Sequence, residues 1–156
     1  HLSLRRQRQM CIRDRNALNA ADSFLVPLQC EYYALEGLSQ LLNTAGLIKK
    51  NLNPQLHIEG IVLTMFDVRN NLSHQVVTEI KNHFGEKVFN AIIPRNVRLS
   101  EAPSHGQSIL EYDSKSIGAT RYLELAHEVI ARAATKTTSE VTQETNSHAY
   151  EGEVNV

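Results

Sequence analysis

Two polar segments, each following an apolar run, contain side chains that could hold a planar base. The first is "TMFDVRNN", residues 64–71, and the second is "IIPRNVRLSEAPSHG", residues 92–106. An apolar side chain at Met65 and the ring of Pro94 can lie against a base, while the carboxamide of Asn96 offers its edge a donor and an acceptor. Spacing alone leaves a plainer alternative open, in which Met65 packs in the core and Pro94 ends a strand.

The same two segments carry arginines whose chemistry suits phosphate. Arg69 lies in the first segment, and Arg98 lies four residues beyond Pro94 in the second. A guanidinium group can donate two hydrogen bonds to a phosphate at once, so both side chains are candidates for binding a polyanion. Ordinary solvated surface is the alternative. Five more cations could widen the patch or simply be solvated: Lys49, Lys50, Lys81, Lys87 and Arg95.

A hydrolytic or metal-dependent reaction has little support in the sequence. Ser100, Glu101, Ser104 and His105 bring hydroxyl, carboxylate and imidazole groups into six positions, but catalytic triads are assembled from distant segments and recognised by geometry. The seven histidines show no HExxH or paired spacing. We therefore assign no catalytic residue and no metal ligand.

Composition indicates a globular chain with one core. Its 156 residues fit a single domain, 42% are hydrophobic and 21% are charged, and no apolar run approaches the length of about 18 residues that a membrane span requires. No secretory signal is visible, and Cys11 and Cys30 form no CxxC pair. These features favour a reducing cytoplasm.

The pattern of apolar residues predicts alternating strands and helices. Short β-branched or apolar runs predict buried strands, and apolar residues spaced by three and four predict helices. The alternation favours an α/β fold with a mostly parallel sheet flanked by helices, in which ligands bind beyond the carboxyl ends of the strands. The predicted strands span residues 23–28, 58–66 and 87–94, and the predicted helices span residues 34–50, 72–84 and 122–133.

The two ends of the chain differ from the middle. Residues 1–15 contain five arginines against one aspartate, lack either periodicity, and are predicted to be a leader foreign to the domain. Residues 135–156 are polar and acidic and are predicted to be a disordered tail. The net charge of -1 therefore hides a basic start and an acidic end, so any binding of nucleic acid depends on a local patch.

From about residue 16 to residue 132 the sequence resembles a known family. "NALNAADSFLVPLQCEYYALEGLSQLLNT", "IEGIVLTMFDVRNNLSHQV", "IIPRNVRLSEAPSHG" and "ILEYDSKSIGATRYLELAHEV" occur in order with few gaps. They resemble the C-terminal half of the ParA/Soj-type chromosome and plasmid partitioning ATPases, which carry a deviant Walker A motif. The resemblance implies that residues 16–134 are part of a P-loop-type ATPase domain.

The resemblance also implies a function. Members of this family bind ATP and Mg²⁺, form an ATP-dependent homodimer on non-specific DNA in the cytoplasm at the nucleoid, and are stimulated by a ParB/Spo0J-type centromere-binding partner. Met65, Pro94 and Asn96 match family positions around the adenine, and Arg69 and Arg98 match its DNA-contacting arginines.

The sequence departs from the family pattern at the phosphates. It contains no KGGxGKT loop, no following strand with a magnesium-binding aspartate, and no "DCPP" strand before Asn16. Because phosphoryl transfer depends on positioning and charge neutralisation by that loop and the metal, we expect no ATP hydrolysis by this chain alone. Two alternatives remain: a MinD-like division-site ATPase, whose basic amphipathic end the acidic tail does not match, and a non-catalytic module that binds DNA or a partner.

Overall fold

Two parallel strands, β1 (Ser23–Gln29) and β2 (His57–Thr64), form the centre of the fold. The computed structural model describes the backbone of residues 12–150 and the side chains of residues 12–135. The strands pair in register from Ser23 opposite His57 to Gln29 opposite Thr64, with one irregularity between Phe24 and Leu25. The remaining elements are a helix over 12–20, α2 (Ala34–Asn51), α3 (Asn71–Phe84), η1 (Gly85–Lys87), α4 (Val97–Glu101), η2 (Ala102–His105), α5 (Ile109–Tyr112) and α6 (Ile117–Tyr150).

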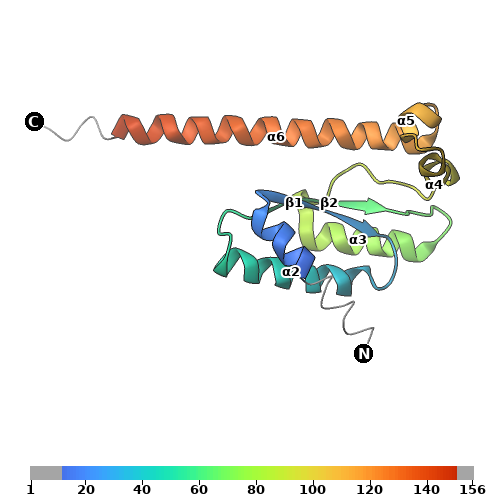
Figure 1. Ribbon diagram of the computed structural model, residues 1–156, viewed down its shortest axis with the longest axis horizontal. Helices are drawn as coiled ribbons and strands as arrows, with labels where there is room; N and C mark the ends of the chain where they lie inside the picture. Colours follow the sequence, from blue (N-terminus) through green and yellow to red (C-terminus); the bar gives the residue numbers. More distant parts are fainter. Residues whose placement is uncertain (1–11, 151–156) are drawn as a thin grey trace, which may run out of the picture.

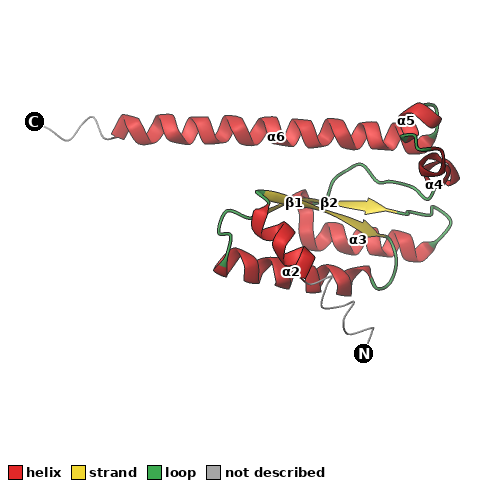
Figure 2. Cartoon of the chain, in the orientation of Figure 1, coloured by secondary structure: helices red, strands yellow, loops and turns green. Residues whose placement is uncertain are grey.

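Helices cover the sheet on both sides. Figures 1 and 2 show α2 and α3 beneath β1 and β2, and α6 crossing above them. Such a layered arrangement buries both faces of β2, whose residues from Gly60 to Leu63 are all buried. The predicted α/β fold, with a parallel sheet flanked by helices, is confirmed.

The core is divided by the alternation of side chains along β2. Ile61 and Leu63 pack in the cluster that also contains residues of α2 and α3, whereas Val62 packs in a second cluster with Phe89 and Ile93. Leu125 and Val129 of α6 cover that second cluster. Successive side chains of a strand point to opposite faces, so the run of apolar residues serves two layers at once.

The third predicted strand, residues 87–94, is not a regular strand in the structure. The segment runs beside β2 and forms only two isolated parallel bridges, Ile61 with Val88 and Phe66 with Pro94. Phe89 and Ile93 still donate their N–H groups to the carbonyls of Ile61 and Leu63, both at 2.9 Å. Between them the N–H groups of Asn90 and Ala91 donate to the carboxylate of Glu128 on α6, so the ladder is not continuous. The prediction of a continuous strand is therefore wrong.

Local signals determine where the first helices begin and end. The side chain of Asn70 accepts a hydrogen bond from the N–H of Leu72 and so caps α3, which ends at Gly85, a residue with a φ of 50°. Asn53 donates through Nδ2 to the carbonyls of Leu18 and Ala21, at 3.1 and 2.8 Å, and thereby closes the end of the first helix. That helix includes residues 12–15, whereas residues 1–11 of the predicted leader lie outside the described residues.

α6 is longer than the sequence pattern predicts. It begins at Ile117 and continues to Tyr150, through most of the segment predicted to be a disordered tail, and residues 151–156 lie outside the described residues. The sequence contains no glycine or proline between Gly118 and Gly152, so no strong helix breaker interrupts it. Among the described residues, none of the helices combines the length and the apolar character needed to cross a membrane.

Candidate functional site

The two candidate loops lie directly side by side. Phe66, just after β2, donates its N–H to the carbonyl of Ile93 at 3.2 Å and accepts the N–H of Arg95 at 2.9 Å. These bonds flank the bridge between Phe66 and Pro94. The carboxyl end of β2 is therefore joined to the second loop at Pro94, which is the arrangement that the parallel sheet predicts.

Met65 has an unusual backbone conformation. Its φ is 54°, the left-handed region that residues with a Cβ seldom adopt, and its side chain is 37% exposed. Such a conformation costs on the order of 1 kcal/mol and is retained where the surroundings impose it, often at a binding site. The structure thus places an apolar side chain at the surface beside half-buried Pro94, and the core alternative for Met65 does not describe this position.

Asn96 has a structural task in addition to its predicted one. Its Oδ1 accepts the N–H of Arg98 at 2.8 Å and caps α4. The predicted contact with the edge of a base used both the donor and the acceptor of the carboxamide. With Oδ1 engaged by the cap, Nδ2 is the group of Asn96 that suits a ring nitrogen or carbonyl of a ligand.

Arg69 is held by a neighbouring carboxylate. Its Nε lies 3.3 Å from Oδ1 of Asp67 and its Nη2 lies 3.4 Å from Oδ2, while its backbone N–H also donates to Oδ1 at 3.0 Å. The hydrogen bonds from the Arg69 side chain and backbone lower the pKa of Asp67. The guanidinium side chain remains 90% exposed, so a phosphate can reach it.

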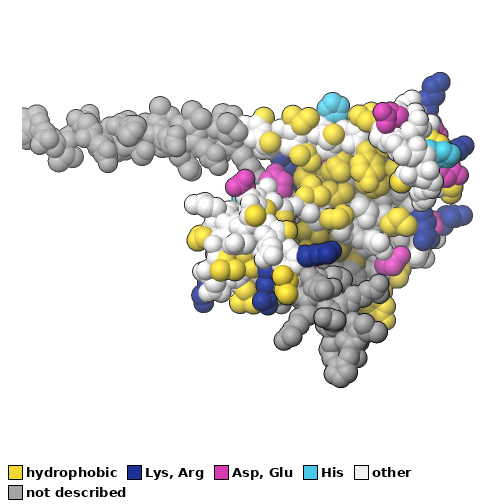
Figure 3. Space-filling view, in the orientation of Figure 1, with side chains coloured by type: hydrophobic (Ala, Val, Ile, Leu, Met, Phe, Trp, Pro, Cys, Tyr) yellow, Lys and Arg dark blue, Asp and Glu magenta, His cyan; other side chains and the backbone are white. Residues whose placement is uncertain are grey.

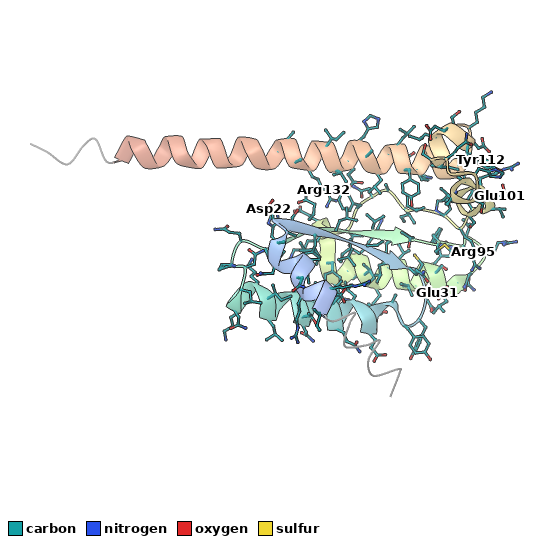
Figure 4. All side chains as sticks on the ribbon, viewed as in Figure 1. Asp22, Glu31, Arg95, Glu101, Tyr112 and Arg132 are labelled. Carbon is teal, nitrogen blue, oxygen red and sulfur yellow. The ribbon has the colours of Figure 1, made fainter. Side chains whose placement is uncertain are left out.

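Arg98 is held in a similar way at the start of α4. Its Nη1 lies 3.0 Å from Oε2 of Glu101, and its Nε lies 3.6 Å from Oδ2 of Asp113. The hydroxyl of Tyr112 donates to the same Glu101 oxygen at 3.2 Å. Figure 4 shows Arg95, Glu101 and Tyr112 at one end of the molecule, and basic side chains gather at this end in Figure 3.

The residues of the hydrolase alternative have packing roles here. Glu101 binds Arg98 and Tyr112, and the ring of His105 stacks on that of Tyr112 with centroids 5.0 Å apart. Cys30 is buried, and burial raises the pKa of its thiol to about 11. In the described part of the chain, no three side chains of His, Cys, Asp or Glu lie together as a metal site would require.

Sequence reasoning missed three residues that shape the site. Asp113 and Tyr112 orient Arg98, and Glu128 holds the backbone that leads to Pro94. The only signal for Glu128 was an arginine four residues later on the same helix, a common surface pair. Nothing in the sequence linked it to a segment 38 residues away.

Replacing Met65 with glycine is expected to separate its backbone strain from its predicted contact with a base. Glycine adopts positive φ without strain, so the free energy of unfolding should rise by a few tenths to about 1 kcal/mol. Binding of a fluorescent adenine nucleotide should weaken several-fold because the apolar contact is lost. Equilibrium denaturation and nucleotide titration test both effects, with Val68→Gly as an exposed control in the same loop. Unchanged nucleotide affinity in Met65→Gly would contradict a base contact at Met65.

Comparisons with known proteins identify similar sequences. A sequence family described as an AAA domain matches residues 9–58. The sporulation initiation inhibitor protein Soj of Bacillus subtilis is 62% identical over 116 residues, covering 74% of this chain and 46% of Soj. The chromosome-partitioning ATPase Soj of Treponema pallidum is 53% identical over 117 residues, covering 75% of this chain and 46% of that protein.

Solved structures share the fold. The crystal structure of cobyrinic acid a,c-diamide synthase from Mycobacterium smegmatis matches with a TM-score of 0.54 and 31% identity, covering 72% of this chain and 39% of that one. The same enzyme with bound ADP and magnesium matches equally well. The fold and these matches define the class, an α/β domain similar to those of the Soj proteins and of this synthase. Over the matched residues the chain belongs to the ParA/Soj type of chromosome partitioning proteins, and it spans a little under half the length of the curated relatives it matches.

Proposed function

We propose that this chain is part of a chromosome partitioning ATPase of the ParA/Soj type. The identity of 53% to 62% with relatives of that name supports the proposal. The observation that carries it is the bridge between Phe66 and Pro94, which brings both loops to one end of the sheet. One short stretch of surface then presents side chains for a base and side chains for phosphate.

The base is proposed to lie against Met65 and Pro94, with Asn96 at its edge. The exposed side chain of Met65, the half-buried ring of Pro94 and the amide Nδ2 of Asn96 are groups of the kinds that an adenine can contact, which supports this proposal. No group of three His, Cys, Asp or Glu side chains gathers among the described residues, and we assign none of them to Mg²⁺. No phosphate loop of the KGGxGKT kind occurs in the sequence, and we derive no step of ATP hydrolysis from these residues.

DNA is proposed to bind through Arg69 and Arg98. Both lie within the two joined segments, and their side chains are 90% and 55% exposed. Each already has a carboxylate partner, so a DNA phosphate must compete with Asp67 or with Glu101 and Asp113. This competition weakens the binding of DNA. Because the two arginines would contact only the phosphate backbone, the binding would have no sequence preference.

The wider assembly follows from the family resemblance. A homodimer formed with ATP, a ParB/Spo0J-type partner that stimulates hydrolysis, and a place in the cytoplasm at the nucleoid are proposed on that ground. The alternative is a module that binds DNA or a partner and does not hydrolyse ATP, and it needs only the arginine contacts. A nucleotide titration distinguishes this alternative from the ATPase proposal. Binding of adenine nucleotide that depends on Met65 supports the ATPase proposal.

Replacing Arg98 with alanine is expected to weaken binding to random duplex DNA several-fold without changing nucleotide affinity. The change removes one phosphate contact, so the slope of log affinity against log salt should fall by about 0.9. Arg121→Ala is the matched control, because Arg121 pairs with Glu124 on the exposed face of α6. Fluorescence anisotropy over a salt series measures both quantities. Equal DNA affinity in Arg98→Ala and the control would count against this surface.

A further inference from the structure

A groove lies at the edge of the sheet opposite to the joined loops. Its lining comes from the amino ends of the strands, with Phe24 in β1 and Ile58 in β2, and from the second half of α2. Figure 1 shows the end of α2 and the start of β2 on the side of the molecule away from α4. The groove has a volume of about 300 Å³. None of its described lining residues is among those proposed to contact a base or DNA.

Most of the groove is lined by apolar residues. Leu42 and Ala45 line it from α2, and Gly46 beside them contributes no side chain. A Cβ added at Gly46 would meet nothing within 4 Å, so the groove is open above that glycine. An open apolar groove beside a helix is a common binding site for the apolar side chains of a segment of another protein. The other apolar lining residues are Phe24, Leu56 and Ile58.

The charged side chains that line the groove are cations. Lys49 in the last turn of α2 and Lys87 at the end of η1 both line it and are exposed. No aspartate or glutamate is among the described residues that line it. The ring of His57 also lines it and lies 3.6 Å from the carboxylate of Glu59, which belongs with Glu86 to the lining of a separate groove. Carboxylates of a bound segment would therefore meet Lys49 and Lys87 and no like charge within the groove.

We propose that this groove binds an acidic amphipathic segment of a partner protein. Apolar side chains of the segment lie against Phe24, Leu42 and Ala45, and its carboxylates pair with Lys49 and Lys87. Duplex DNA gains nothing from an apolar lining, and two lysines offer it few phosphate contacts. A bilayer surface does not follow a groove of this size, whereas the side chains of a protein segment can fill it.

Labelled synthetic peptides test the proposal by fluorescence anisotropy with the full chain. The first places leucine on one helical face and glutamate on the other, and its twin has the same composition with the leucines scattered around the helix. We expect the first peptide to bind at least tenfold more tightly than its twin. The double variant Lys49→Glu with Lys87→Glu should weaken binding of the first peptide at least tenfold. A counterpart with lysine in place of every glutamate should bind that variant more tightly than it binds the parent chain.

A second variant blocks the groove without changing its charge. Gly46→Leu places a side chain in the open space, and leucine has a higher helix propensity than glycine, so far-UV circular dichroism should show that α2 stays folded. We expect Gly46→Leu to weaken binding of the first peptide at least fivefold. Gly37→Leu is the matched control and should leave binding unchanged. Gly37 also lies within α2 and has nothing within 4 Å of an added Cβ, but it does not line the groove.

The charge variant has a control of equal net charge. Lys81 and Lys115 are exposed, and neither lines the groove. The double variant Lys81→Glu with Lys115→Glu should therefore bind the first peptide as the parent chain does. The gain of the lysine counterpart in Lys49→Glu with Lys87→Glu reports on charge in a way that a folding defect cannot imitate.

Several results would overturn the proposal. Equal loss of peptide binding in the two charge variants would reduce the effect to net charge, and unchanged binding in Gly46→Leu would show that the segment does not enter the groove. Self-association of the chain that Gly46→Leu abolishes would make a second copy the occupant. Loss of duplex DNA binding, or of binding to phosphatidylglycerol vesicles, in Lys49→Glu with Lys87→Glu but not in its control would assign this surface to nucleic acid or to a membrane.

Discussion

Replacing Glu128 with alanine is expected to lower the free energy of unfolding by about 3 kcal/mol. The carboxylate accepts the N–H of Asn90 at 2.9 Å, the N–H of Ala91 at 3.2 Å and Nη2 of Arg132 at 2.8 Å. Alanine would leave two backbone donors without this acceptor in the segment that runs beside β2. Arg132 would lose that carboxylate and keep its contacts with the carbonyl of Val88 and the ring of Phe89. Urea denaturation followed by circular dichroism measures the change.

Glu124→Ala is the matched control for Glu128→Ala. Glu124 lies on the same helix and also pairs with an arginine, but both partners are about half exposed. Exposed pairs contribute about 0 to 1 kcal/mol, so the control should unfold almost as the parent does. Equal destabilisation by the two substitutions would mean that the bonds from Asn90 and Ala91 contribute little.

The stabilisation by Glu128 should also depend on pH. Burial raises the pKa of its carboxyl, but the N–H donors of Asn90 and Ala91 and the guanidinium of Arg132 outweigh burial and lower it overall. The folded pKa then lies below the unfolded value of about 4.3, so the stabilisation is present above that value and is lost as pH falls through the folded pKa. The difference in unfolding free energy between the parent and Glu128→Gln should therefore narrow below about pH 4. A difference that stays constant down to pH 2 would contradict the lowered pKa.

Replacing Gly60 with alanine is expected to cost about 2 to 3 kcal/mol of unfolding free energy. A Cβ at Gly60 would collide with Cε2 of Phe89 and lie 2.9 Å from the carbonyl oxygen of Lys87. The Phe89 ring is fully buried, and the guanidinium of Arg132 lies 4.0 Å from its centroid, so the ring cannot move aside easily. The carbonyl oxygen of Lys87 belongs to the backbone, so no change of side-chain rotamer can move it away from the new Cβ.

Gly46→Ala provides the opposite expectation for the same chemical change. An added Cβ meets nothing within 4 Å at Gly46, which lies inside α2, so this substitution should stabilise the chain by up to about 1 kcal/mol. The double variant Gly60→Ala with Phe89→Leu should recover part of the loss by making room. Thermal and urea unfolding distinguish the variants, and a neutral Gly60→Ala would show that β2 and the segment after η1 can separate at little cost.

The sequence predicted the elements that local pattern determines. β1, α2, β2 and α3 follow from short apolar runs and helical periodicity, and each lies within a few residues of its predicted span. The parallel order also placed the loops of Met65 and Pro94 at the same end of the sheet. These features depend on neighbours in the chain or on simple rules of connection.

The remaining features depend on contacts between distant residues. The segment 87–94 has the composition of a strand, and Phe89 and Ile93 pair with β2, but the carboxylate of Glu128 on α6 accepts the N–H of Ala91 between them. The left-handed φ of Met65 has no sequence signal, since glycine or asparagine normally occupies that region. Asp113 pairs with Arg98, although η2 and α5 lie between the two residues in the sequence. No rule of sequence spacing predicts this pair.

Helix α6 is anchored to the segment beside β2 and projects beyond the sheet. Figure 1 shows the helix extending well past the edge of the sheet, while Glu128 ties it to the backbone at Ala91, three residues before Pro94. Leu125 and Val129 of α6 also pack against Phe89 and Ile93, and Arg132 donates to the carbonyl of Val88. The position of the segment that leads to Pro94 is therefore coupled to the position of α6.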